Sequence, residues 1–409
     1  MKPPCPPYFG NEFRTNRIKK GVEVLFVIAL IPTLFIGSNS LSYAFSLVLL
    51  PVSVFVHITS DVPRKWYGIP VWISLAMAIC IASAFWSYTP LATLHLALRG
   101  TLPAIILILL IGSMPSRRAW TLFKRCLAVS IVASLIAVLF WDHAVHSIYD
   151  PLIAGSWRGL YNHKNEAGAV GAVATIIFTD AWLRTKSKLD LCIAIASIVF
   201  LWGTQSRTAL LLTVIAYMAL LFIRRWYAGG YGRAVVGFYA ILGASVIAMA
   251  LSDAEIQYWL FNDPYNFTGR VGIWRTALSV WSDRPWLGFG FRSIFGDNSP
   301  NLIGDAVTPF AAIAPHPHSS YLQTMIGTGL IGLVFMSVGL VVVPVVKTIG
   351  ITDTIDPEPV PMCFAIIVFS SLRSVFESPA FQFARPSWIF WSISVAILYA
   401  FMNQQRISQ

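Results

Sequence analysis

The chain has 409 residues, of which 56% are hydrophobic and only 11% are charged, whereas roughly a quarter of a soluble domain is charged. The apolar residues form long blocks, so most of this chain is predicted to lie in lipid. The net charge of +11 does not indicate a nucleic-acid partner, because the basic residues stand in short runs between apolar blocks and form no recognition module.

Apolar segments of about 17–25 residues are needed to cross a bilayer as helices. The sequence predicts about twelve of them, within a single integral membrane domain over residues 1–409. In chain order they are expected at 22–38, 41–58, 67–86, 93–112, 119–141, 167–183, 189–204, 207–223, 233–251, 319–346, 360–376 and 386–402. The predicted fold class is therefore an all-α polytopic membrane protein.

The distribution of lysine and arginine predicts the orientation of the chain in the membrane. One set of loops, made up of every second loop between the predicted spans, contains both lysine and arginine. The positive-inside rule places these loops and the N-terminus in the cytoplasm. The periplasmic face then has almost only arginine: Arg99, Arg158, Lys164, Arg207, Arg270, Arg275, Arg284, Arg292, Arg373 and Arg385. Because a guanidinium group suits phosphate recognition, this bias indicates an anionic ligand; pairing with lipid headgroups is the alternative.

The segment 252–318 is predicted to be a periplasmic loop between the ninth and tenth helices. Its residues 269–283 have apolar side chains at helical spacing: Ile273, Trp274, Ala277, Leu278 and Trp281. We expect an amphipathic helix that lies on the membrane surface. One proline and two glycines within 284–291 then predict a tight turn.

Arg207 is a candidate phosphate ligand at a helix start. It is flanked by Ser206 and Thr208 at the periplasmic end between two predicted helices. Free N–H groups and the positive end of the helix dipole would face the same side, which favours a diphosphate site. A simple snorkelling arginine is the alternative interpretation.

Two histidines, His316 and His318, stand directly before the helix predicted at 319–346. No metal and no cofactor are expected, because no cysteine or carboxylate lies nearby at ligand spacing. A neutral imidazole can accept a proton from a sugar hydroxyl, whereas the alternative is an ordinary interfacial polar residue. We favour His318 as the base because the helix would hold it in place, and we expect His316 to contact substrate.

A second polar segment, 156–171, precedes the helix predicted at 167–183. Its candidate substrate-binding residues are Arg158, His163, Lys164 and Asn165. A helix cap would explain Asn165 and Glu166 equally well.

Carboxylates are not expected to perform the chemistry, because the periplasmic side has neither an Asp-x-Asp motif nor an obvious acid/base pair. Arg373 and Glu377 are four residues apart near the end of the span 360–376. This spacing predicts a structural ion pair between them.

Together these motifs resemble the superfamily of O-antigen ligases and Wzy-type O-antigen or exopolysaccharide polymerases. The ligase motif of His, then Asn, Ser or Gln, nine residues, Gly, two residues and Gly is met by His318, Ser319, Gly329 and Gly332. The serine-arginine pair of the family resembles Ser206 and Arg207. Its Gly-Arg-x-x-x-Trp, followed by Pro-x-x-Gly-x-Gly, resembles Gly269, Arg270, Trp274, Pro285, Gly288 and Gly290.

The resemblance implies a metal-independent, inverting glycosyltransferase. Its donor would be an undecaprenyl-diphosphate-linked glycan, and its acceptor a sugar hydroxyl on the periplasmic face. By the same resemblance Arg207 and Arg270 hold the diphosphate, and His318 assists the acceptor hydroxyl. Trp274 belongs to the same motif and is expected to contact substrate, while membrane lipids surround the protein.

The segment from Trp157 to Gly168 resembles the Arg-Gly-x-x-x-His-Lys-Asn segment of the exopolysaccharide polymerase branch. A polymerase is therefore favoured, and a ligase that joins the glycan to lipid A-core is the alternative. A transporter of lipid-linked sugars is less favoured, because the polar residues gather at the predicted helix ends and not at the midplane.

Overall fold

A computed structural model of the chain describes residues 9–36, 40–60, 70–147, 149, 153–229, 233, 237, 252–264, 266–294, 316–351, 358–382 and 385–408. Within these residues the regular structure is helical, apart from one isolated bridge between Val145 and Trp157. Five of the described helices are long and apolar enough to cross a membrane. The all-α prediction is therefore confirmed for this part of the chain.

The first half comprises α1 (Phe9–Ile31) with a π-helical turn (Pro32–Ile36), α2 (Ser40–Thr59), α3 (Val71–Ala82) with a 3-10 turn (Ser83–Trp86), α4 (Pro90–Gly112), α5 (Ser116–Phe140), a 3-10 turn (Asp142–Ala144), α6 (Lys164–Thr185), α7 (Lys188–Gly203) and α8 (Arg207–Tyr227). The second half comprises α10 (Ala254–Phe261), α11 (Asn266–Ser282), α13 (Ser320–Ser337), a π-helical turn (Val338–Val342), α14 (Val343–Ile349), α15 (Val360–Phe376) and α16 (Pro386–Ser408). The predicted spans overlap these helices, except 233–251, which lies largely outside the described residues.

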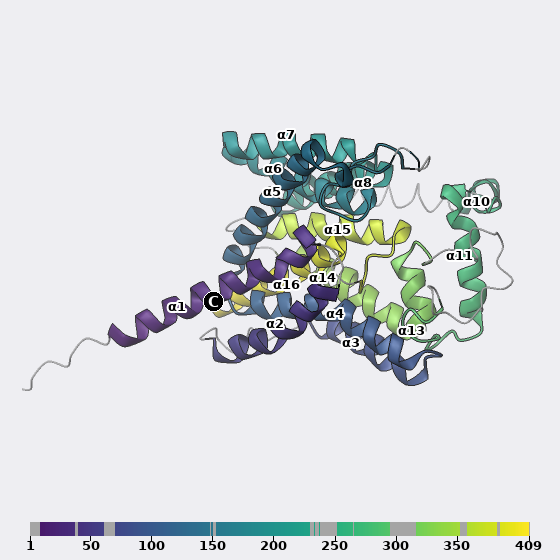
Figure 1. The fold of residues 1–409 in the computed structure, drawn as a ribbon, viewed down its shortest axis with the longest axis horizontal. Coiled ribbons are helices and arrows are strands. Elements are labelled where there is room, and N and C mark those ends of the chain that lie inside the picture. The colour runs from purple at the N-terminus through teal and green to yellow at the C-terminus, as the bar shows by residue number, and fades with distance from the viewer. Residues whose placement is uncertain are drawn as a thin grey trace, which may run out of the picture.

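The core of the bundle lies around α6, α15 and α16. In Figure 1, α6, α7 and α8 lie together at the top, α15 and α16 run through the middle, and α2, α3, α4 and α13 lie below. Trp388 and Trp391 of α16 are fully buried. Helix α6 is buried on nearly all sides, and its own buried residues include small ones such as Gly168 and Gly171. A helix surrounded in this way has little freedom to move, so its first residues are held firmly.

The amphipathic helix predicted at 269–283 is α11, which runs across one end of the bundle (Figure 1). Its residues Ile273 and Ala277 are fully buried, and Ala277 packs with Ile326 of α13. Leu278, placed on the same apolar face by the sequence pattern, is 45% exposed. The apolar face of α11 therefore packs mainly against protein, which corrects the expectation that this face rests on the membrane surface.

The glycine motifs join the turn after α11 to a break in α13. Gly329 lies inside α13 with a φ of 67°, so the helix is interrupted there. The turn packs against this break, where the N–H of Phe289 donates to the carbonyl of Ile326 at 2.9 Å and the N–H of Leu330 donates to the carbonyl of Pro285 at 2.9 Å. The two motifs, far apart in the sequence, thus form one backbone-to-backbone contact.

We predict that Gly329→Ala destabilises the protein by about 2 kcal/mol or more, because of the positive φ and the crowding. A Cβ atom at this position would lie 1.9 Å from the carbonyl oxygen of Trp286. Thermal unfolding of the purified protein in detergent, followed by tryptophan fluorescence, measures the change. Gly21→Ala in α1 is the control, since its Cβ would have no neighbour within 4 Å. Equal unfolding temperatures for the two variants would contradict the prediction.

Candidate functional site

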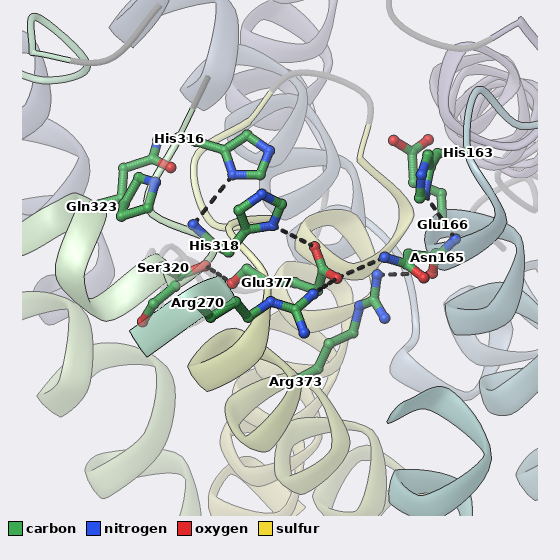
Figure 2. A network of polar contacts seen from close by, with 12 residues as sticks. His163, Asn165, Glu166, Arg270, His316, His318, Ser320, Gln323, Arg373 and Glu377 are labelled. Atoms are coloured by element: carbon green, nitrogen blue, oxygen red, sulfur yellow. Dashed lines mark hydrogen bonds and ion pairs between the residues drawn. The ribbon is translucent and has the colours of Figure 1, made fainter. Parts of the chain in front are cut away.

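The candidate site lies where the ends of α6, α13 and α15 meet α11. Figure 2 shows Asn165 of α6, Arg270 of α11, His318 before α13 and Glu377 after α15 directed toward one another. The N–H of Ser320 donates to the backbone carbonyl of Glu377 at 3.0 Å. This bond fixes the beginning of α13 against the end of α15.

The carboxylate of Glu377 is the common partner in this cluster. It accepts a hydrogen bond of 2.7 Å from the side-chain amide of Asn165. It also forms an ion pair with Arg270, at a distance of 3.0 Å. Its second oxygen lies 3.9 Å from Nδ1 of His318, which is longer than a hydrogen bond. Arg373 instead donates to the backbone carbonyl of Asn165 at 2.8 Å.

The predicted ion pair between Arg373 and Glu377 is therefore wrong. The spacing rule for helices applies while both residues are helical, but α15 ends at Phe376 and Glu377 has extended backbone angles. The side chain of Glu377 consequently turns away from its own helix and toward Arg270.

The cluster keeps Glu377 ionised. Burial by itself would raise the pKa of this carboxyl group, but His318, Arg373 and Arg270 outweigh it and lower the pKa to about 2. A fixed negative charge therefore faces His318 at neutral pH.

The two histidines occupy a constrained turn. His318 has a φ of 50°, and its backbone N–H lies 3.3 Å from Nδ1 of His316, which accepts the hydrogen bond. The ring centroids are 4.1 Å apart. Burial, followed by the influence of His318, lowers the pKa of His316 to about 4, so His316 is neutral at pH 7. Trp274 fixes this turn by donating to the carbonyl of Pro317 at 3.1 Å.

A cavity of about 250 Å³ opens between these groups and the start of α16. Its polar and charged lining residues are Asn162, His163, Asn165, Glu166, His316, His318, Arg373, Glu377, Ser378, Gln382, Arg385 and Ser387. At the end away from the histidine pair, Arg385 forms an ion pair with Glu166. No group of three or more His, Cys, Asp or Glu suited to a metal ion occurs among the described residues.

His163 lines the cavity from the start of α6. Its Nδ1 accepts a hydrogen bond from the N–H of Asn165 at 3.1 Å and caps the helix. Burial is the main reason that its pKa falls to about 4. The cavity is therefore lined by neutral imidazoles at His163 and His316.

Several sequence candidates lie outside the cavity lining. Arg207 begins α8 and is exposed, although Oγ of the preceding Ser206 lies 3.4 Å from the side-chain oxygen of Asn165. Arg158 donates to the backbone carbonyls of His143 and Asn162. The backbone N–H of Lys164 donates to His146 at 3.2 Å.

The sequence did not predict Glu377 as a partner of His318 or Gln382 as a cavity residue. It named Glu166 only in the helix-cap alternative and Arg385 only among the periplasmic arginines, and both line the cavity. A signal was present, because Glu377 and Arg385 stand between the apolar blocks predicted to span the membrane at 360–376 and 386–402. Charged residues at such a position are candidates for a functional site.

Comparisons with known proteins agree with the motifs. A family model described as O-antigen ligase matches residues 192–337. An O-antigen ligase of Pseudomonas aeruginosa is 27% identical over 291 residues, which cover 69% of this chain and 63% of that protein. The exopolysaccharide production protein ExoQ of Rhizobium meliloti is 22% identical over 338 residues, or 78% of this chain and 75% of that protein.

The resemblance to this superfamily is confirmed. The match extends over less than two thirds of the length of the Pseudomonas ligase. The family match and the apolar helices together indicate a multi-pass membrane protein.

We predict that acidification from pH 7.5 to 5 destabilises the folded protein through His163 and His316. Their pKa values are about 4 in the folded chain and about 6.5 when unfolded, so the unfolded chain binds more protons in this range. The loss is at most about 2 kcal/mol per histidine at pH 5, and less where a ring meets solvent.

The unfolding temperature at pH 7.5 and at pH 5 measures this effect. Replacing both histidines with glutamine should remove most of the pH dependence. His143→Gln, at an exposed position, is the control and should retain it. A double variant with the full pH dependence would show that other groups cause it.

Proposed function

We propose that this protein is a membrane glycosyltransferase that moves a glycan from undecaprenyl diphosphate to a sugar hydroxyl. The supporting observation is the placement of His318 beside the ionised carboxylate of Glu377, with Arg270 on the same carboxylate. The similarity to O-antigen ligases and to ExoQ supports the same reaction class.

In this proposal His318 is the general base. Glu377 faces Nδ1, so it favours the tautomer with a proton on Nδ1 and leaves Nε2 able to accept one. The 3.9 Å separation is compatible with a contact that shortens when substrate binds. Glu377 also stabilises the imidazolium cation that forms when the acceptor loses its proton.

The bonds made and broken follow from this assignment. Nε2 of His318 takes the proton of the acceptor hydroxyl as the hydroxyl oxygen attacks the anomeric carbon of the donor. The bond from that carbon to the phosphate oxygen breaks with its electron pair, and undecaprenyl diphosphate leaves. Attack from the side opposite the leaving group inverts the anomeric configuration.

We place the site on the periplasmic side of the inner membrane, in a chain of twelve spans with 252–318 outside. The mixed lysine and arginine of the opposite loops support this orientation. The position of α11 across the same end of the bundle as the candidate site supports a loop outside the hydrocarbon region (Figure 1).

Two acceptors are compatible with this chemistry. A polymerase joins the glycan to another lipid-linked glycan. In favour of this acceptor, His163 of the polymerase-like segment lines the cavity, and Asn165 of the same segment binds Glu377. A ligase would transfer to lipid A-core, and the family match together with the Pseudomonas relative favours that alternative. We prefer the polymerase because its characteristic segment contributes directly to the site.

We predict that His318→Ala lowers turnover by about 10²–10⁴ at unchanged protein level, because the proton acceptor is lost. A purified, detergent-solubilised enzyme given a labelled lipid-linked repeat unit reports the rate. Trp274→Phe is the matched control: it removes the bond to Pro317 but keeps the base, and should lose less activity. Retention of most activity by His318→Gln would exclude proton abstraction by this residue.

A deletion strain separates polymerase from ligase. We predict that the strain loses high-molecular-weight polysaccharide while single repeat units still reach their lipid carrier or export route. Gel analysis of surface polysaccharide and of extracted lipid-linked glycan shows which product is missing. Accumulation of full-length polymer on undecaprenyl diphosphate with bare lipid A-core would identify the ligase instead.

A further inference from the structure

A narrow crevice lies beside the main cavity, on the other side of His316. Its polar and charged lining residues are Arg292, Ser293, His316 and Gln323, and its other lining residues are Gly290, Ile294, Ile326 and Gly327. His316 borders both the crevice and the main cavity. The crevice is therefore adjacent to the proposed base, yet its lining differs from that of the cavity.

Arg292 brings a positive charge to this crevice. It lies in the turn after α11 with a φ of 56° and is partly buried. Burial is the main cause that lowers the pKa of its guanidinium group, and the positive charge of Arg99 is the second. Within the described part of the chain no carboxylate forms an ion pair with it, although Arg270 and Arg385 pair with Glu377 and Glu166.

Gln323 adds a hydrogen-bond donor without an acceptor. It is only 6% exposed, and its side-chain oxygen accepts a bond from Gln382 at 3.4 Å. Its buried amide nitrogen has no hydrogen-bond partner in the described structure. Buried N–H groups are almost always satisfied in folded proteins, so this one requires an acceptor.

His316 is a third donor. Its Nδ1 accepts the backbone N–H of His318, so the proton of the neutral ring is on Nε2. Figure 2 shows Gln323 on one side of the two histidines and Glu377 on the other. The crevice thus combines a guanidinium group with two neutral N–H donors. It lies on the side of the two histidines away from the negative charge of Glu377.

We propose that Arg292, Gln323 and His316 bind a phosphate oxygen of the isoprenyl diphosphate. This inference rests on the proposed function and identifies the residues that receive the donor. A set of donors without a carboxylate suits an oxyanion, and a guanidinium group binds phosphate through charge-assisted hydrogen bonds. Since the crevice is narrow, one oxygen enters it and the remainder of the diphosphate lies over its mouth.

This placement differs from one that relies on Arg270 alone. Because Glu377 neutralises Arg270, a diphosphate that approached Arg270 would also meet the charge of Glu377. At Arg292 the diphosphate would meet no carboxylate among the described residues. The leaving group would then sit on one side of His316, and the acceptor hydroxyl would enter the main cavity on the other side.

The test measures binding of farnesyl diphosphate, a soluble short isoprenyl diphosphate, to the purified full-length protein in a non-ionic detergent. We expect Arg292→Gln to weaken binding about 10- to 100-fold, as loss of a charged hydrogen bond implies. Without ligand, the same variant should unfold at an equal or higher temperature, because it removes a partly buried charge that has no carboxylate partner among the described residues. Gln323→Leu should weaken binding by a smaller factor.

Arg275→Gln is the matched control, since Arg275 is an exposed arginine of α11. It should bind farnesyl diphosphate as the wild type does. Equal affinity of Arg292→Gln and the wild type would overturn the proposal, as would equal losses in Arg292→Gln and Arg275→Gln. Binding needs no glycan transfer, so absence of transfer with Arg292-dependent binding would reject only the proposed function.

Dihexanoyl phosphatidylglycerol in a competition experiment separates the two sources of phosphate. Weak or no displacement of farnesyl diphosphate supports an isoprenyl diphosphate site. Displacement at equal concentration, dependent on Arg292, would show that the crevice holds a phospholipid headgroup and would overturn the donor assignment.

Discussion

The carboxylate of Glu377 joins elements that approach the candidate site from different parts of the chain. It binds Asn165 of α6 and Arg270 of α11, and it faces His318 ahead of α13. Removing a partner from a buried ion pair typically costs about 3–5 kcal/mol, because the remaining charge stays buried. Glu377 is therefore both a structural link between helix ends and the group that orients the proposed base.

The balance of charge around the site assigns different tasks to its two sides. In the main cavity, Arg385 is paired with Glu166, and Arg270 is paired with Glu377 at its edge. Arg373 also lines the cavity and donates to the backbone carbonyl of Asn165. The neutral imidazoles of His163 and His316 and the amides of Asn162, Asn165 and Gln382 line it too, which suits the hydroxyl groups of a sugar. Arg292, in contrast, faces the crevice without a carboxylate partner among the described residues, which suits a phosphate.

The sequence predicted the helices well because apolar blocks in a polytopic membrane protein correspond directly to spans. It also identified His316, His318 and Arg270, which the structure brings together. Pairwise contacts could not be predicted in the same way: Arg270 and Glu377 are 107 residues apart, whereas the helical spacing rule considers only near neighbours. For the same reason α11 was expected on the membrane, since sequence periodicity defines an apolar face without identifying what covers it.

Ion pairs also connect α6 and α15 at the ends that lie away from the candidate site. Asp180 of α6 is 1% exposed and forms ion pairs with Arg184 and with Arg224 of α8. Arg184 also binds Glu358, just before α15, at 2.8 Å. Since Asn165 and Glu377 join these same helices at the site, α6 and α15 are linked at both ends. A rotation or slide of α15 would break ion pairs at both ends, so the separation between Glu377 and His318 is determined by the whole bundle and not by the site alone.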